Sequence, residues 1–195
     1  AATTFGSLSA GGGNMVFIKK LTASADANLT FVDGASSVVL DSTYKEYLFT
    51  FNNIHPATDD SKLLVNFRDG GTDYDATKTT TFFRAQHSEG GANGNLSYRT
   101  DDDLAQSTAA QPLTMDIGNA NDESASGEMI LYNPSSTTFV KHFIANANCV
   151  YSGDYSMQSF VAGYCNVTAA IDAVQFTMEG GTNIDSGDIC LYGIL

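Results

Sequence analysis

Two groups of closely spaced aspartates are the residues of this sequence best suited to chemistry, because together they could bind a metal ion. The six members are Asp69, Asp73, Asp75, Asp101, Asp102 and Asp103. Hard cations such as Ca²⁺ prefer clustered carboxylate and carbonyl oxygens on flexible turns. We therefore predict that any calcium ion bound by this protein lies at one of these two loops. Neither loop has the ligand spacing of an EF-hand, so the alternative is two acidic loops that face water.

Other catalytic and metal-binding patterns are missing from the sequence. His55, His87 and His142 are far apart, and there is neither a G-x-S-x-G elbow nor an H-E-x-x-H pair. Two carboxylates could act as they do in glycosidases, but with 22 acidic residues some carboxylates are almost bound to lie close together by chance. We expect no cofactor besides the calcium ion considered above, and we predict that the protein is not an enzyme.

The three cysteines are predicted to be structural. Cys149, Cys165 and Cys190 each lie in or beside an apolar run, and no C-x-x-C spacing occurs. A free cysteine in such a run behaves as a small buried hydrophobe. An odd number leaves at least one thiol unpaired, while a disulfide between Cys149 and Cys165 stays open as an alternative.

Four tyrosines in or beside polar loops could contact a glycan or a protein partner. They are Tyr74, Tyr98, Tyr151 and Tyr155. Exposed tyrosines stack on sugars and anchor protein interfaces. The alternative is that these rings cap the open ends of the fold. The absence of tryptophan weakens the sugar hypothesis.

The charge of the chain limits its partners. The formal net charge is −13 at pH 7, which opposes attraction to nucleic acid or to an anionic membrane surface. No apolar run approaches the eighteen or so residues of a membrane span. We expect no nucleic-acid partner and no membrane insertion.

The elements that position these residues are predicted to be short β-strands. Residues 1–14 are small, rich in glycine and uncharged, which is typical of an extended arm. From Met15 onward, apolar runs alternate with turn residues and give about ten strands. The clearest alternation is Val174, Phe176 and Met178 against their neighbours. The one helical turn expected lies in residues 101–110.

This pattern predicts an all-β fold. We expect one domain over residues 15–195, an antiparallel β-sandwich of jelly-roll type with an extended N-terminal arm. The apolar stretch 189–194 is predicted to be a terminal strand that is paired and buried. Gly180 and Gly181 are expected to turn the preceding strand toward it.

Several phrases, in one order along the chain, resemble a family of virion-associated structural proteins of marine tailed bacteriophages. They are LTFVDG at 29–34, LDSTYKEYL at 40–48, NIHPA at 53–57, TTTFF at 79–83, NPSSTTFVKHF at 133–143, NIDSG at 183–187 and LYGI at 191–194. The similarity runs from about residue 20 to residue 195. The resemblance implies a structural or surface role in a phage particle, and it supplies no catalytic residues.

The expected function is therefore that of a capsid decoration or cement-like protein on the virion exterior, bound to partners such as the major capsid protein. Phe5 and Leu8 are predicted to anchor the arm on neighbouring subunits. We expect a homo-oligomer, for example a trimer. One alternative is the tip of a tail fibre that recognises host surface glycans. Another is a secreted carbohydrate-binding or adhesin module.

Overall fold

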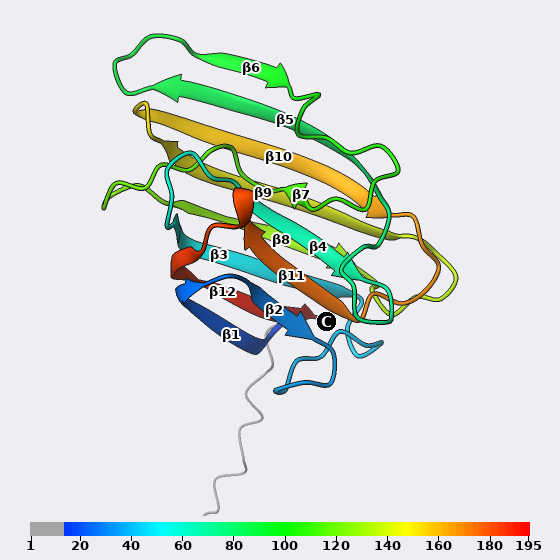
Figure 1. Cartoon of the computed structure of the whole chain (residues 1–195). Helices are drawn as coiled ribbons and strands as arrows, with labels where there is room; N and C mark the ends of the chain where they lie inside the picture. The colour runs from blue at the N-terminus through cyan, green and yellow to red at the C-terminus, as the bar shows by residue number, and fades with distance from the viewer. Residues whose placement is uncertain (1–13) are drawn as a thin grey trace, which may run out of the picture.

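The computed structural model describes residues 14–195, in which twelve β-strands and one short 3-10 turn form two antiparallel sheets (Figure 1). The first strands are β1 (Met15–Asp26), β2 (Leu29–Val32), β3 (Glu46–Pro56), β4 (Leu63–Arg68), β5 (Lys78–Ser88) and β6 (Asn95–Tyr98). They are followed by β7 (Gln111–Pro112), β8 (Ala125–Tyr132), β9 (Lys141–Tyr151), β10 (Tyr155–Cys165), β11 (Ala173–Met178), the turn η1 (Glu179–Gly181) and β12 (Ile184–Ile194). The predicted all-β class is confirmed.

The two sheets differ in width. The large sheet has the order β1-β12-β3-β8-β9-β10-β5-β6, and the small sheet has the order β2-β11-β4-β7. Along the chain β1, β2, β3 and β4 alternate between the two sheets, and β7, β8, β11 and β12 do so again. The pairs β5–β6 and β9–β10 both join the large sheet and widen it at one side. This two-sheet arrangement is consistent with the expected β-sandwich.

The core lies between the sheets and is rich in phenylalanine. Phe176 of β11 faces Phe49 and Phe51 of β3, with ring centroids 5.5 and 5.4 Å away. Phe31 of β2 lies 6.2 Å from the same ring. Val174, Phe176 and Met178 are buried, while Gln175 and Thr177 are partly exposed, so the predicted alternation of β11 is confirmed. Because alternate residues of a strand point to opposite faces, this pattern turns β11 toward the large sheet.

The last strand is held inside the large sheet, as the sequence predicts. β12 pairs with β1 on one side and β3 on the other, and Ile189 and Leu191 are fully buried. Gly180 and Gly181 both have φ near 73° and form the turn before it. This turn leads from β11 in the small sheet to β12 in the large one, so the predicted turn is confirmed, and the two strands it joins lie in different sheets.

The helical turn predicted for residues 101–110 is not formed, so this prediction is wrong. This segment runs beside β5, where the backbone N–H of Lys78 donates to the carbonyl of Ser107 and that of Thr80 to Leu104. These pairings use backbone groups that a helix would need for itself. The arm anchors Phe5 and Leu8 lie outside the described residues.

Candidate functional site

The predicted calcium loops do not form one ligand set. Asp73 and Asp75 are exposed loop residues, and Asp102 is buried with its carboxylate already bound by cationic side chains. Within residues 14–195 no three His, Cys, Asp or Glu side chains converge to hold a metal ion. The aspartate runs therefore remain two separate loops, of which one contains an internal ion pair.

That ion pair ties the loop around residue 102 to the small sheet. Lys62 Nζ lies 2.8 Å from Asp102 Oδ1, and Arg99 Nε lies 3.0 Å from Asp102 Oδ2. The Asp102 side chain is 1% exposed. Burial by itself would raise the pKa of this carboxyl, but the hydrogen bonds from Lys62 and Arg99 outweigh it and hold the pKa below its usual range. Asp102 is thus ionised and paired inside the fold.

A second buried group contains two amines and a thiol. Lys78, Cys165 and Lys141 are opposite one another on β5, β10 and β9, and all three are fully buried. Lys78 Nζ donates to Asn66 Oδ1 at 2.6 Å and to the carbonyl of Ala76 at 2.7 Å. Because the amines bind acceptors of the chain itself, this group ties strands to loops.

Burial changes the titration of this group. It lowers the pKa of Lys78 to about 8, and it raises the pKa of Cys165 to about 12. Cys149, Cys165 and Cys190 are all free and buried, so the predicted burial is confirmed and the disulfide between Cys149 and Cys165 is not formed. The two thiols with raised pKa values, Cys149 and Cys165, are poor nucleophiles.

Lys78→Met is expected to remove a pH-dependent part of the stability. The folded pKa near 8 is below the unfolded value near 10.4, so between these values the unfolded chain binds more protons and stability rises with pH. Relative to Lys78→Met, the wild type should gain about 2.5 kcal/mol between pH 8 and 10.5. Urea unfolding at pH 7.5, 9 and 10.5 measures this difference. A difference that stays constant across the range would contradict it, and exposed Lys45→Met is the control.

The four predicted contact tyrosines lie in different surroundings. Tyr151 and Tyr155 face each other at 6.2 Å at the β9–β10 turn and pack against the core. The Arg68 guanidinium lies over the Tyr74 ring at 5.9 Å. Tyr98 is exposed on β6, where its hydroxyl donates to Asp103 Oδ2 at 2.5 Å. Tyr98 is thus the one that projects from the outer surface of the large sheet.

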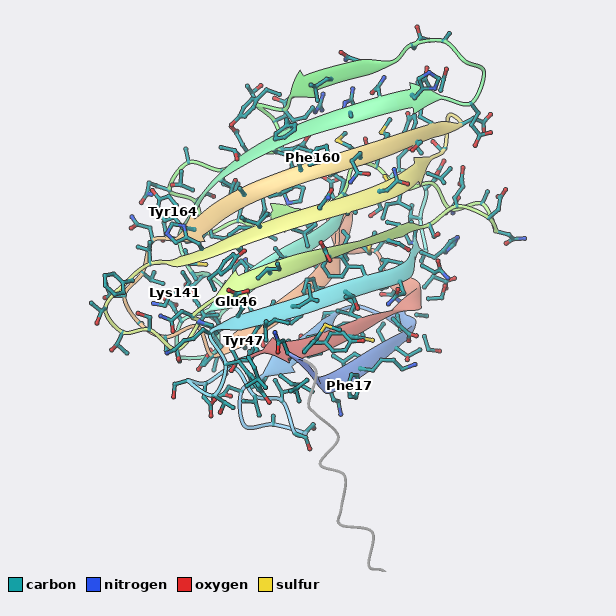
Figure 2. The ribbon with its side chains drawn as sticks, turned by 180° about the vertical axis from the view of Figure 1, so that it is seen from behind. Phe17, Glu46, Tyr47, Lys141, Phe160 and Tyr164 are labelled. Carbon is teal, nitrogen blue, oxygen red and sulfur yellow. The ribbon has the colours of Figure 1, made fainter. Side chains whose placement is uncertain are left out.

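This outer surface, which we name the open face, is the side of the large sheet turned away from the small sheet (Figure 2). Among residues 14–195 eight large hydrophobic side chains are exposed, and six of them belong to strands of this face. The six are Met15, Phe17, Phe83, Leu96, Tyr98 and Ile144. Figure 2 shows Phe17 at one side of the face and Phe160 and Tyr164 toward the other.

Strand register aligns the apolar side chains of the open face into a row. Its members, one from each successive strand from β1 to β10, are Phe17, Tyr192, Leu48, Ile130, Ile144 and Ala162. Beside this row Phe83 and Phe160 are stacked at 4.8 Å with an angle of 11° between the rings. Tyr98 is the cross-strand partner of Phe83. A continuous apolar surface of this kind is typical of an interaction site.

One half of the large sheet, formed by β9, β10, β5 and β6, has no acidic residue in its strands, although the chain has 22. A shallow hollow of about 390 Å³ lies here, over Ala162 and between Ile144 and Tyr164. Elsewhere on the face, Asp188 is paired with Lys20 at 3.2 Å. The strands of this half thus carry no negative side chain of their own, and the Asp103 carboxylate reaches the β6 edge, where it accepts from Tyr98.

Sequence reasoning identified Tyr98 but missed the open face as a whole. Each strand contributes only a few residues to it, and residues that are neighbours on the face can be distant in sequence, as Leu48 and Ile130 are. A signal did exist in the alternation of β10, where Phe160, Ala162 and Tyr164 occupy the face opposite buried Ser159 and Val161. A strand that is apolar on both faces indicates that the second face also meets a partner.

The comparisons with known proteins do not identify a family. No protein-family model and no curated protein matches the chain. One solved structure, a protein of unknown function from Bacteroides ovatus at 2.40 Å resolution, is 6% identical with a TM-score of 0.30. The match covers 54% of this chain and 45% of that one, so the chain spans less than half of its length. In residues 14–195 no helix is long and apolar enough to span a membrane.

Proposed function

We propose that the chain is a non-enzymatic structural protein on the exterior of a phage particle, where it binds other virion proteins through the open face. The observation that supports this proposal is the aligned apolar row across the large sheet. A row of exposed and half-buried apolar side chains is unfavourable in water, and a second surface that covers the row removes this cost. The resemblance to virion-associated phage proteins supplies the setting.

Charge supports the exterior location. With a net charge of −13, the chain is repelled by packaged DNA, and its acidic loops remain in contact with solvent. The open face is where this repulsion is weakest, because half of its strands contain no carboxylate. A protein that attaches by one neutral face and presents an acidic surface outward suits a decoration role on a capsid, with the major capsid protein as partner.

The strand order supports the finer assignment to the jelly-roll type. Without β5–β6 and β9–β10, each sheet has four strands, β1-β12-β3-β8 and β2-β11-β4-β7, and the chain passes from one sheet to the other at every step except that from β4 to β7. Two such interleaved four-stranded sheets make the eight strands of a jelly roll. The two extra strand pairs are then insertions, and they build the acid-free half of the open face.

Purified particles provide the test. We expect the protein in hundreds of copies per particle by quantitative mass spectrometry, and we expect purified protein to bind particles that lack it. Phe17→Glu should weaken this binding at least tenfold, because it places a charge in the apolar row. Phe139→Glu is the matched control, since Phe139 is exposed but lies outside the strands. Absence from particles would overturn the proposal.

The runner-up is the tip of a tail fibre, and the stacked Phe83 and Phe160 rings beside Tyr98 favour it. Aromatic faces of this kind also stack on sugars. A handful of copies per particle, together with binding to host polysaccharide, would support a fibre. Polysaccharide binding by a protein that particles do not contain would support a secreted carbohydrate-binding or adhesin module.

A further inference from the structure

We propose that the acid-free half of the open face, formed by β9, β10, β5 and β6, binds the same half of a second copy of this chain. The two sheets stack face to face about a two-fold axis. This inference rests on the proposed function, because it names a second copy of the chain as the partner of one half of the same open face. It makes the building unit of the assembly a dimer with its acidic loops turned outward.

Charge is the first argument for a second copy. A basic partner would be recognised by carboxylates, yet this half of the sheet has none on either face of its four strands. A partner with its own acidic surface would be repelled by the loops around the face unless it also presented a neutral patch. A second copy meets this condition, because the patch that it presents is the same neutral surface.

The size of the surface is the second argument. β5, β9 and β10 each have 11 residues, which at about 3.3 Å per residue gives a length of about 36 Å. Four strands spaced about 4.8 Å apart give a width of about 19 Å. Because β6 has only 4 residues, the face of this half is about 580 Å², close to the roughly 600 Å² per partner at the lower end of stable interfaces.

The relief of the surface is the third argument. Phe83 and Ile144 project from it and are 41% and 51% exposed. Beside them lies the hollow over Ala162, which is lined by Thr81 and Tyr164. In a two-fold interface both copies use the same residues, so a side chain that one copy inserts into its partner is also inserted by the partner. A ridge and a hollow on one patch therefore allow both copies to pack at once.

The proposal predicts how the dimer responds to salt. Each copy has a net charge of −13, so the long-range interaction between two copies is repulsive, and salt screens it. The dimer should therefore tighten between 50 mM and 500 mM NaCl. A complex held together by opposite charges would loosen over the same range.

Sedimentation equilibrium of the full chain at both salt concentrations tests the inference. The wild type is expected to be a dimer that strengthens with salt. Ile144→Glu combined with Phe83→Glu should weaken dimerisation at least 30-fold, because two charges per copy would enter an apolar interface. Phe17→Glu is the matched control, since it places the same charge on the same face at the β1 edge. Circular dichroism checks that all variants remain folded.

Each other outcome overturns the inference. A monomeric wild type, a trimer, a dimer that loosens with salt, or an equal effect of Phe17→Glu would exclude pairing through the acid-free half. The outcomes also separate this inference from the proposed function. A monomer that still binds particles would overturn only the dimer, while a dimer that particles do not contain would overturn only the virion role.

Discussion

Phe176→Ala is expected to lower the free energy of unfolding by about 4 kcal/mol, the magnitude seen when a large aromatic side chain is removed from a core. The ring is fully buried at the centre of the space between the sheets. It meets Phe31 from the small sheet and Phe49 and Phe51 from the large sheet, all with centroids within 6.2 Å. Its removal leaves a cavity that touches both layers at once.

The expected loss of unfolding free energy in Phe176→Ala has two sources. The lost transfer free energy of the ring is one part, and the cavity left by its neighbours is the other. The neighbours cannot close the gap easily, because Phe31 and Phe49 already pack edge to face at 5.4 Å and are held by separate sheets. Edge-to-face pairs also contribute beyond the area that they bury.

Urea unfolding at pH 7 measures this effect, with Phe139→Ala as the control. Phe139 is 70% exposed, so its truncation should change stability by less than about 0.5 kcal/mol. A loss under 1.5 kcal/mol for Phe176→Ala would mean that the sheets move together and fill the cavity. In that case the two layers would be less rigidly joined than their aromatic contacts indicate.

The parts of this fold that the sequence predicted are those with local signals. The alternation of Val174, Phe176 and Met178 marks the inner face of β11, and the apolar stretch before residue 195 marks β12. Such patterns depend only on neighbours two residues apart. They identify strands and their buried faces without any knowledge of which strands pair.

The parts that the sequence did not predict depend on distant residues. The acidic run around Asp102 is typical of a solvated loop, and only the fold brings Lys62 to it from a position 40 residues away. The ends of β9 and β10 are hard to recognise in the sequence because Asn148 and Ser156 lie on the open face, where polar residues conceal the strand pattern. The open face itself exists only after eight strands are in register.

The inserted strand pairs connect the buried and the exposed features of the molecule. β5 and β10 carry Lys78 and Cys165 on the inner side and Phe83 and Phe160 on the outer side. The loop that contains Asp102 continues along the edge of β5, through backbone hydrogen bonds with Lys78 and Thr80. Interactions that stabilise this side of the sandwich therefore also hold the strands of the open face in place. The ion pair of Asp102 is one of these interactions.

Asp102→Ala is expected to cost about 4 kcal/mol at pH 7, because it breaks a buried ion pair and leaves two cations without their closest acceptor. Lys62 would keep only Asp116 at 3.8 Å and Glu179 at 3.7 Å, both longer than its 2.8 Å contact with Asp102. Arg99 would lose its one ion pair among the described residues. Asp101→Ala is the matched control, since this exposed neighbour should change stability by less than about 0.5 kcal/mol.

The pH dependence separates this ion pair from a packing effect. The folded pKa of Asp102 lies below its unfolded value near 3.9, so the stabilisation is present above pH 4 and is lost as the pH falls through the folded pKa. The difference between wild type and Asp102→Ala should stay constant from pH 7 to 5 and decrease below pH 4. Urea unfolding at pH 7, 5 and 3 measures it. An undiminished difference at pH 3 would mean that Asp102 stabilises the loop through its shape and not through its charge.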